Sequence, residues 1–296
     1  AFDEREAITA IRSARELGVN IFDTAQAYGF GASERLLGRA LAGELAANRE
    51  RIVLATKGGL RPTSEGLVRD SSRAWIRRGV EESLRSLGVE YIDLFQVHWP
   101  DPLVTFAEVA DTLQELVDEG KIRHAGVSNF DARQVAQYSR VRPAETVQPP
   151  YHLFRRDVER DLLPYAGEHD IGVLVYGPLA HGLLTGAIDE DTTFAEGDWR
   201  AQSPIFDGLR LERTLEGVRE LEHFASERGY SLAQLAIAWT LSHPAVHTAI
   251  VGSRRASHIA DAVAAVDIIF SVGDLAAIDE IVSHVMPIDG PTPEAV

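Results

Sequence analysis

The stretch DLFQVHWPD, residues 93–101, sets two polar side chains on one face of an otherwise apolar pattern. Side chains alternate across a strand, so Gln96 and His98 point to the same side as Leu94. A histidine in such a place can orient an oxygen atom or help to pass a proton. Taken alone, a His on an apolar strand is more often a core residue with one hydrogen-bond partner.

Further polar residues follow apolar stretches in the same way: Asp23, Tyr28, Lys57, Ser128, Asn129, Gln148 and Tyr176. A Lys beside a Tyr favours the phenolate, and an Asp keeps that Lys charged. Such a phenol can donate a proton to an oxygen while a hydride reaches the attached carbon. Singly, Asp23 could cap a helix, Lys57 could be solvated and Tyr28 could cover a turn. The chemistry is expected only where the fold brings these groups together.

Seven apolar stretches predict the strands that would position these residues: 19–25, 51–57, 91–99, 123–129, 145–151, 171–177 and 247–253. Amphipathic helical stretches separate them, as at 105–121. This alternation predicts an α/β fold, a (β/α)8 TIM barrel, with a doubly wound sheet as the alternative. A closed barrel of this type has eight strands, so we expect the first strand to be missing from the recorded chain. The polar residues would then meet at the C-terminal ends of the strands.

Composition narrows the class of protein. The 296 residues, 45% of them hydrophobic, suit one large barrel or two smaller domains, and because no linker or composition shift marks a boundary we expect one domain over 1–296. The net charge of −16 argues against a nucleic-acid partner. Within this domain we expect an irregular loop at 184–208 and a C-terminal tail at 284–296. No apolar run suggests a membrane span, and the absence of Cys excludes cysteine nucleophiles and favours a cytoplasmic setting. We expect a small-molecule substrate and a monomer or weak homo-oligomer.

A family resemblance rests on seven motifs in a fixed order: FDTAQAYGFGASERLLGRAL, ATKGG, DLFQVHWPDP, GKIRHAGVSNF, QPPYHLF, YGPLAHGLLTG and IVGSRR. In this order and spacing the chain resembles the aldo-keto reductase superfamily from about Arg12 to Ala264, and its prokaryotic-type branch most closely. The resemblance implies an NADP-dependent reductase of the carbonyl reductase or alcohol dehydrogenase type. Such an enzyme uses NADPH to reduce an aldehyde or ketone to an alcohol.

The same resemblance implies roles for individual residues. The catalytic group would be Asp23, Tyr28, Lys57 and His98, with Tyr28 as the proton donor and Trp99 lining the substrate pocket. Contacts to the cofactor are implied for Ser128, Asn129, Gln148, Tyr176, Gly177, Leu179, Gly182, Ser253, Arg254, Arg255 and His258. The SRR cluster at 253–255 would bind the 2′-phosphate, and the preference for NADP over NAD rests on it. No metal is expected. The loop at 184–208 and the tail are candidates for walls that select the substrate.

Four other functions can be compared with the residues that each of them would require. A Rossmann site at YGFGASE fails because Glu34 stands where a third glycine is needed. A metal hydrolase is disfavoured because His98, His124 and Asp101 lack a tight ligand spacing. A Schiff-base aldolase with Lys57 as nucleophile remains open, since a strand-end Lys suits that chemistry. A regulatory subunit that binds the cofactor with little turnover also remains open.

Overall fold

The main sheet is a curved row of parallel strands in a computed structural model that describes residues 3–253 and 255–288. Its strands, in spatial order, are β1 (Ile21–Asp23), β2 (Val53–Gly58), β5 (Ile92–Val97), β6 (Ile122–Ser128), β7 (Thr146–Gln148), β8 (Gly172–Tyr176) and β9 (Thr248–Ile250). All seven predicted strands are present, most of them with shorter bounds. The barrel class is confirmed, and the eighth strand of a closed barrel is not among the described residues.

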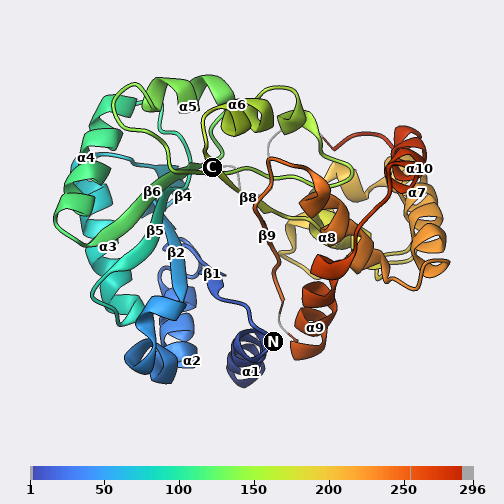
Figure 1. Cartoon of the computed structure of the whole chain (residues 1–296), viewed down its shortest axis with the longest axis horizontal. Helices are drawn as coiled ribbons and strands as arrows, with labels where there is room; N and C mark the ends of the chain where they lie inside the picture. Colours follow the sequence, from blue (N-terminus) through green and yellow to red (C-terminus); the bar gives the residue numbers. More distant parts are fainter. Residues whose placement is uncertain (1–2, 254, 289–296) are drawn as a thin grey trace.

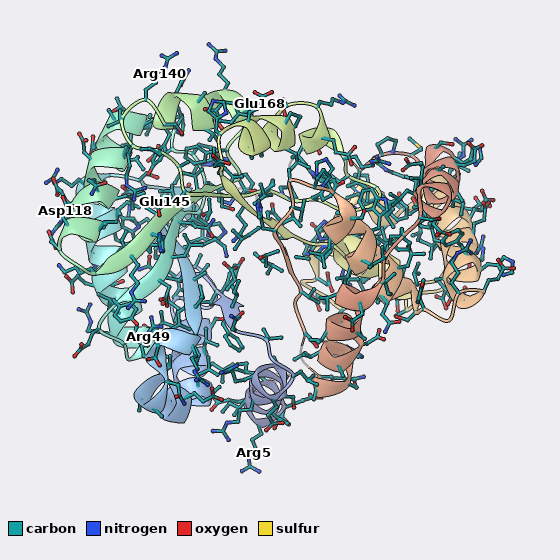
Figure 2. The ribbon with its side chains drawn as sticks, viewed as in Figure 1. Arg5, Arg49, Asp118, Arg140, Glu145 and Glu168 are labelled. Carbon is teal, nitrogen blue, oxygen red and sulfur yellow. The ribbon has the colours of Figure 1, made fainter. Side chains whose placement is uncertain are left out.

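Helices surround this sheet (Figure 1). They are α1 (Glu4–Glu16), α2 (Ala32–Ala47), α3 (Arg73–Leu87), α4 (Phe106–Asp118), α5 (Ala132–Tyr138), α6 (Leu162–Glu168), α7 (Gly208–Ser226), α8 (Leu232–Ser242), α9 (Ala256–Ala264) and α10 (Val272–Ser283). Figure 2 shows Arg5, Arg140 and Glu168 pointing outward from this helical layer. None of the helices in the described part of the chain has the length and apolar character needed to cross a membrane.

Local signals explain where several helices begin. The side chain of Thr105 accepts a hydrogen bond from the backbone N–H of Glu108 at the start of α4. Asp131 forms a capping box with Gln134 at the start of α5. Such side chains satisfy N–H groups that have no partner inside the helix. These caps therefore set the residue at which each helix begins after the preceding strand.

The sheet is open between β1 and β9 within the described residues, and Figure 1 shows these two strands facing each other across the centre. Helix α1 packs against α9 at this side of the molecule. Each of the other neighbouring strand pairs in the sheet is parallel and hydrogen-bonded. Their C-terminal ends therefore lie at one end of the barrel, as the strand–helix alternation predicted.

Two features lie between the barrel strands: a hairpin that was not predicted, and the irregular segment that was expected at 184–208. The antiparallel hairpin β3 (Leu60–Thr63) and β4 (Gly66–Arg69) follows β2 and was not predicted. A Pro at position 62 argues against a strand from sequence, but a two-stranded hairpin tolerates it at an edge. The long segment before α7 contains short 3-10 turns, including Trp199–Gln202 and Pro204–Phe206.

Candidate active site

A buried ion pair lies at the C-terminal ends of β1 and β2. The ammonium Nζ of Lys57 contacts Oδ1 of Asp23 and donates a 2.9 Å hydrogen bond to the backbone oxygen of Thr24. The two side chains are only 2% and 7% exposed. A charge that is removed from water in this way needs such partners. The pair therefore fixes a positive charge just inside the barrel mouth.

Tyr28 lies above this pair, on the loop from β1 to α2. The centroid of its ring is 5.6 Å from the Lys57 Nζ atom. It is also 5.9 Å from the centroid of the His98 ring, with the two rings nearly perpendicular. The Tyr28 side chain is 38% exposed, so a small molecule can reach it. The phenol thus stands between a fixed cation, an imidazole and the solvent.

His98 follows β5 and is almost fully buried. Its backbone N–H donates a 2.9 Å hydrogen bond to the oxygen of Gly58, which ties it to the end of β2. Burial, together with the positive charge of Lys57, lowers the pKa of His98 to about 3. Among the described residues its Nδ1 atom has no hydrogen-bond partner. The imidazole is therefore neutral near pH 7 and can act as a hydrogen-bonding group.

Gln148, at the end of β7, joins the ion pair to the opposite side of the barrel. Its Nε2 atom donates to Oδ2 of Asp23 at 3.0 Å and to Oε1 of Gln96 at 2.8 Å. The Ser128 hydroxyl donates a 2.9 Å hydrogen bond to the backbone oxygen of Gln148. These three predicted residues, Asp23, Ser128 and Gln148, are thus linked directly although their strands are far apart in sequence.

Asn129 organises the next part of the mouth and has a left-handed backbone, with φ +61°. Its Nδ2 atom donates to the backbone oxygen of His98 at 2.9 Å and to the Ser128 hydroxyl at 3.1 Å. Its Oδ1 atom accepts a 2.8 Å hydrogen bond from the Tyr176 hydroxyl. The orientation of the Tyr176 ring, at the end of β8, is therefore fixed through Asn129.

The remaining predicted cofactor residues form two groups. Gly177 and Gly182 have φ angles of +70° and +105° in the turn after β8, where Leu179 is half-buried. A Cβ atom at Gly177 would meet nothing within 4 Å, so the backbone there can be approached closely. The second group follows β9: the Ser253 hydroxyl donates a 2.9 Å hydrogen bond to the Arg255 oxygen, and Arg255 and His258 are exposed. Arg254 lies outside the described residues.

Two parts of the site were not predicted in detail. The guanidinium carbon of Arg69, on the hairpin strand β4, lies 5.3 Å from the centroid of the Trp99 ring and helps to cover this residue. Below the ion pair, Gln96 donates from Nε2 to Oγ1 of Thr146 at 3.2 Å. In the sequence, the polar face of DLFQVHWPD already set Gln96 beside His98. The glycine at position 126, inside a strand, was the signal that another residue packs closely against the backbone there.

The chain as a whole matches a known enzyme family. The profile of the Aldo/keto reductase family matches residues 1–283. The chain is 44% identical to Aldo-keto reductase YhdN of Bacillus subtilis (strain 168) over 254 residues, which cover 86% of this chain and 76% of that protein. A probable voltage-gated potassium channel subunit beta of Arabidopsis thaliana is 35% identical over 282 residues, with 90% and 84% covered.

Solved structures agree with the sequence comparison. The glycerol dehydrogenase AKR11B4 from Gluconobacter oxydans superposes with a TM-score of 0.89 at 39% identity, covering 99% of this chain and 90% of that one. An aldo/keto reductase from Klebsiella pneumoniae in complex with NADP and acetate gives a TM-score of 0.74 at 29% identity, covering 98% and 88%. The fold and site define an oxidoreductase of the barrel type. The chain belongs to the aldo/keto reductase family.

Proposed function

We propose that this protein reduces an aldehyde or ketone to an alcohol with NADPH as the hydride donor, and that Tyr28 donates the proton. One arrangement carries the proposal: a reachable phenol lies between a buried Asp23–Lys57 pair and a neutral His98. These groups come from three strands: Asp23 and Tyr28 from the end of β1 and the loop after it, Lys57 from β2, and His98 from just after β5. The arrangement suits proton transfer to a substrate oxygen.

The proton step uses the chain's own groups. As the carbonyl carbon becomes an alcohol carbon, its oxygen gains electron density and takes the phenolic proton of Tyr28. The positive charge of Lys57 stabilises the phenolate that remains, and Asp23 keeps that lysine charged and in place. A proton from solvent then restores the phenol, which is exposed enough to exchange with water.

His98 would orient the substrate. A neutral imidazole can donate one hydrogen bond to the carbonyl oxygen without adding a second positive charge beside Lys57. Trp99, which is largely buried beside Arg69, would form one wall of the pocket. The 184–208 segment offers a second wall, since the Trp199 ring lies 5.0 Å from the His181 ring beyond β8.

The donor set at the mouth fits the nicotinamide end of the cofactor, which when bound supplies the hydride. Gln148 has used its N–H groups within the protein, so its carbonyl oxygen is suited to accept from a carboxamide NH2. Ser128 and Asn129 lie beside it, and the Tyr176 ring is held by Asn129 in a position to stack on a planar ring. Gly177 and Gly182 would pass the pyrophosphate with their backbone.

The preference for NADPH over NADH depends on the start of α9. Arg255 is exposed there beside Ser253, and a guanidinium with a hydroxyl can bind a 2′-phosphate. Its Nε atom also lies 3.7 Å from Oε1 of Glu6 in α1, so a phosphate would compete with that carboxylate. The similar Klebsiella pneumoniae reductase was solved in complex with NADP, which supports this choice of cofactor.

The decisive experiment is turnover by the purified protein with NADPH across a panel of small aldehydes and ketones, followed by loss of absorbance at the nicotinamide band. We expect oxidation of NADPH that depends on the carbonyl compound. Tight binding of NADPH with no turnover on any compound would overturn the proposal in favour of the regulatory subunit. Borohydride trapping of a substrate on Lys57 would instead indicate an aldolase, although the ion pair with Asp23 disfavours a free amine.

Three broader expectations belong to the same proposal. Residues 1–296 would form one domain, the protein would work in the cytoplasm, and it would be a monomer or weak homo-oligomer. The oligomeric state can be tested directly by size-exclusion chromatography with light scattering, which measures the mass of the protein in solution.

A further inference from the structure

A row of paired residues crosses the sheet from Lys57 of the candidate active site, and its members are buried except for Thr146, which is half-buried. The strand register pairs Lys57 with Gln96, Gln96 with Gly126 and Gly126 with Thr146. Residues paired in this register point to the same face of the sheet. Gln96 is fully buried and polar, yet the proposed reaction makes no use of it. Its place beside Lys57 and below Gln148 raises the question of whether it positions these residues.

A chain of hydrogen bonds connects this row to the ion pair. Gln148 donates from Nε2 to Asp23 at 3.0 Å and to Oε1 of Gln96 at 2.8 Å. Gln96 in turn donates from Nε2 to Oγ1 of Thr146 at 3.2 Å. The two amides therefore lie in series between a carboxylate at one end and a hydroxyl at the other.

The charge of Asp23 sets the direction of this chain. A carboxylate can only accept, so Gln148 must turn its NH2 group toward Asp23. The second N–H of that group then faces Gln96, which must present its oxygen and turn its own NH2 group to Thr146. Reversing one amide would place acceptor against acceptor or donor against donor. The oxygen of Gln148 is consequently the atom that this pattern directs to a ligand.

The position of Thr146, the last residue of this hydrogen-bond chain, is restricted by its neighbours: a glycine is paired with it on each of the two adjacent strands. A Cβ atom at Gly126 would collide with the Thr146 hydroxyl oxygen. A Cβ atom at Gly172 would lie 3.3 Å from Cγ2 of the same threonine. Since glycine leaves no side chain to pack, two of them around one residue indicate that its room is needed. The hydroxyl is thus held against Gln96.

We propose that Gln96 is a positioning residue for the nicotinamide: with Thr146 it locks the Gln148 amide so that its oxygen accepts the carboxamide NH2 of the cofactor. The inference rests on the proposed function, because it needs a nicotinamide beside Gln148. It adds a residue that touches neither substrate nor cofactor and acts through Gln148.

The test compares two cofactors that differ only in the group that Gln148 would recognise. NADPH carries a carboxamide, and the reduced 3-acetylpyridine analogue has a methyl group in place of the NH2. Dissociation constants for both are measured by calorimetry on the parent, Gln96→Leu and Thr146→Val. Thr146→Ser is the matched control, since it keeps the hydroxyl. Thermal unfolding of each variant reports folding.

We expect the parent to bind the analogue roughly tenfold more weakly than NADPH, as for one lost hydrogen bond with its partner left unpaired. In Gln96→Leu and Thr146→Val this ratio should fall toward one, while Thr146→Ser keeps the parent ratio. Thr146→Val carries the test if Gln96→Leu does not fold.

Three results would count against the inference. A parent ratio of one shows that the Gln148 oxygen does not read the NH2 group. A parent-like ratio in a folded Gln96→Leu or Thr146→Val variant, even with weaker binding of both cofactors, shows a structural role only. A parent that binds no NADPH overturns the proposed function, and the inference falls with it.

Discussion

The ammonium of Lys57 lies 5.6 Å from the centre of the Tyr28 ring and is anchored from below by Asp23. Lys57 is the last residue but one of β2 and Asp23 ends β1, whereas Tyr28 stands on the loop that leaves β1. The cation is therefore fixed by the sheet, and the phenol is brought to it by a loop. This division makes the roles of the three residues separable by substitution.

Removing the Tyr28 hydroxyl should abolish most of the reduction and leave the cofactor site intact. Tyr28→Phe keeps the ring beside His98 but has no proton to give, so we expect kcat to fall by about 10²- to 10⁴-fold. The dissociation constant of NADPH, measured by fluorescence titration, should stay close to that of the parent. Full turnover in this variant would show that another group supplies the proton.

Breaking the buried ion pair should cost stability as well as activity. Lys57→Met leaves the Asp23 carboxylate without its main partner in a nearly dry place, and we expect a loss of about 3–5 kcal/mol in the free energy of unfolding. Adding Asp23→Asn should recover part of it. Urea unfolding measures both.

A matched control for that experiment is the pair between Arg219 and Glu190, whose side chains are 55% and 57% exposed. Arg219→Met should change the unfolding free energy by at most about 1 kcal/mol, because water screens an exposed pair. Equal effects of Lys57→Met and Arg219→Met would mean that burial gives the Asp23–Lys57 pair no special weight.

His98 should make folding less favourable in acid. The pKa of His98 is about 3 in the folded protein, against 6.5 for a free imidazole. Between these pH values the unfolded chain binds a proton that the folded chain does not, so stability falls as the pH falls, by about 1.4 kcal/mol per unit. His98→Asn removes this dependence. We expect the difference in unfolding free energy between parent and variant to change by about 2–3 kcal/mol from pH 6.5 to 4.5. A constant difference would indicate that the buried ring titrates normally.

Glu34 should have the opposite pH dependence. Burial raises the pKa of Glu34 above its usual 4.5, although hydrogen bonds, chiefly from Thr56, oppose the shift. The folded chain then keeps a proton that the unfolded chain has lost, so this contribution is complete below pH 4.5 and is lost as the pH rises through the folded pKa. Glu34→Gln should gain stability relative to the parent between pH 4.5 and 8 in urea unfolding. A relative loss over that range would contradict the prediction.

Arg255 and Glu6 should tune the choice of cofactor in opposite directions. Arg255→Ala is expected to weaken NADPH binding roughly tenfold and to leave NADH binding unchanged, since only NADPH has the 2′-phosphate. Glu6→Gln should strengthen NADPH binding slightly, because the carboxylate near Arg255 no longer competes. Parallel titrations with both cofactors provide the internal control. If Arg255→Ala weakens the two cofactors equally, the 2′-phosphate is bound elsewhere.

The sequence predicted the barrel strands and the polar residues at their ends because both signals are local. Hydrophobic runs such as IGVLVYG indicate a buried parallel strand whatever surrounds them. Asp23, Lys57, His98 and Gln148 could then be grouped, since parallel strands finish at one end of a barrel. The hairpin β3–β4 was missed because its short strands carry a proline and exposed side chains.

Tertiary structure alone decided which of these polar residues touch. The sequence placed Gln96 on the same face as His98, but only the register of β5, β6 and β7 sets it between Gln148 and Thr146. Likewise, the neutral state of His98 follows from its burial beside Lys57, which no local pattern contains. Periodicity and strand ends are encoded in neighbouring residues, and so the sequence determined the fold class and the set of candidate groups. Cross-strand contacts and burial depend on residues far apart in the chain, and so the hydrogen-bond partners and charge states emerged only when the barrel was assembled.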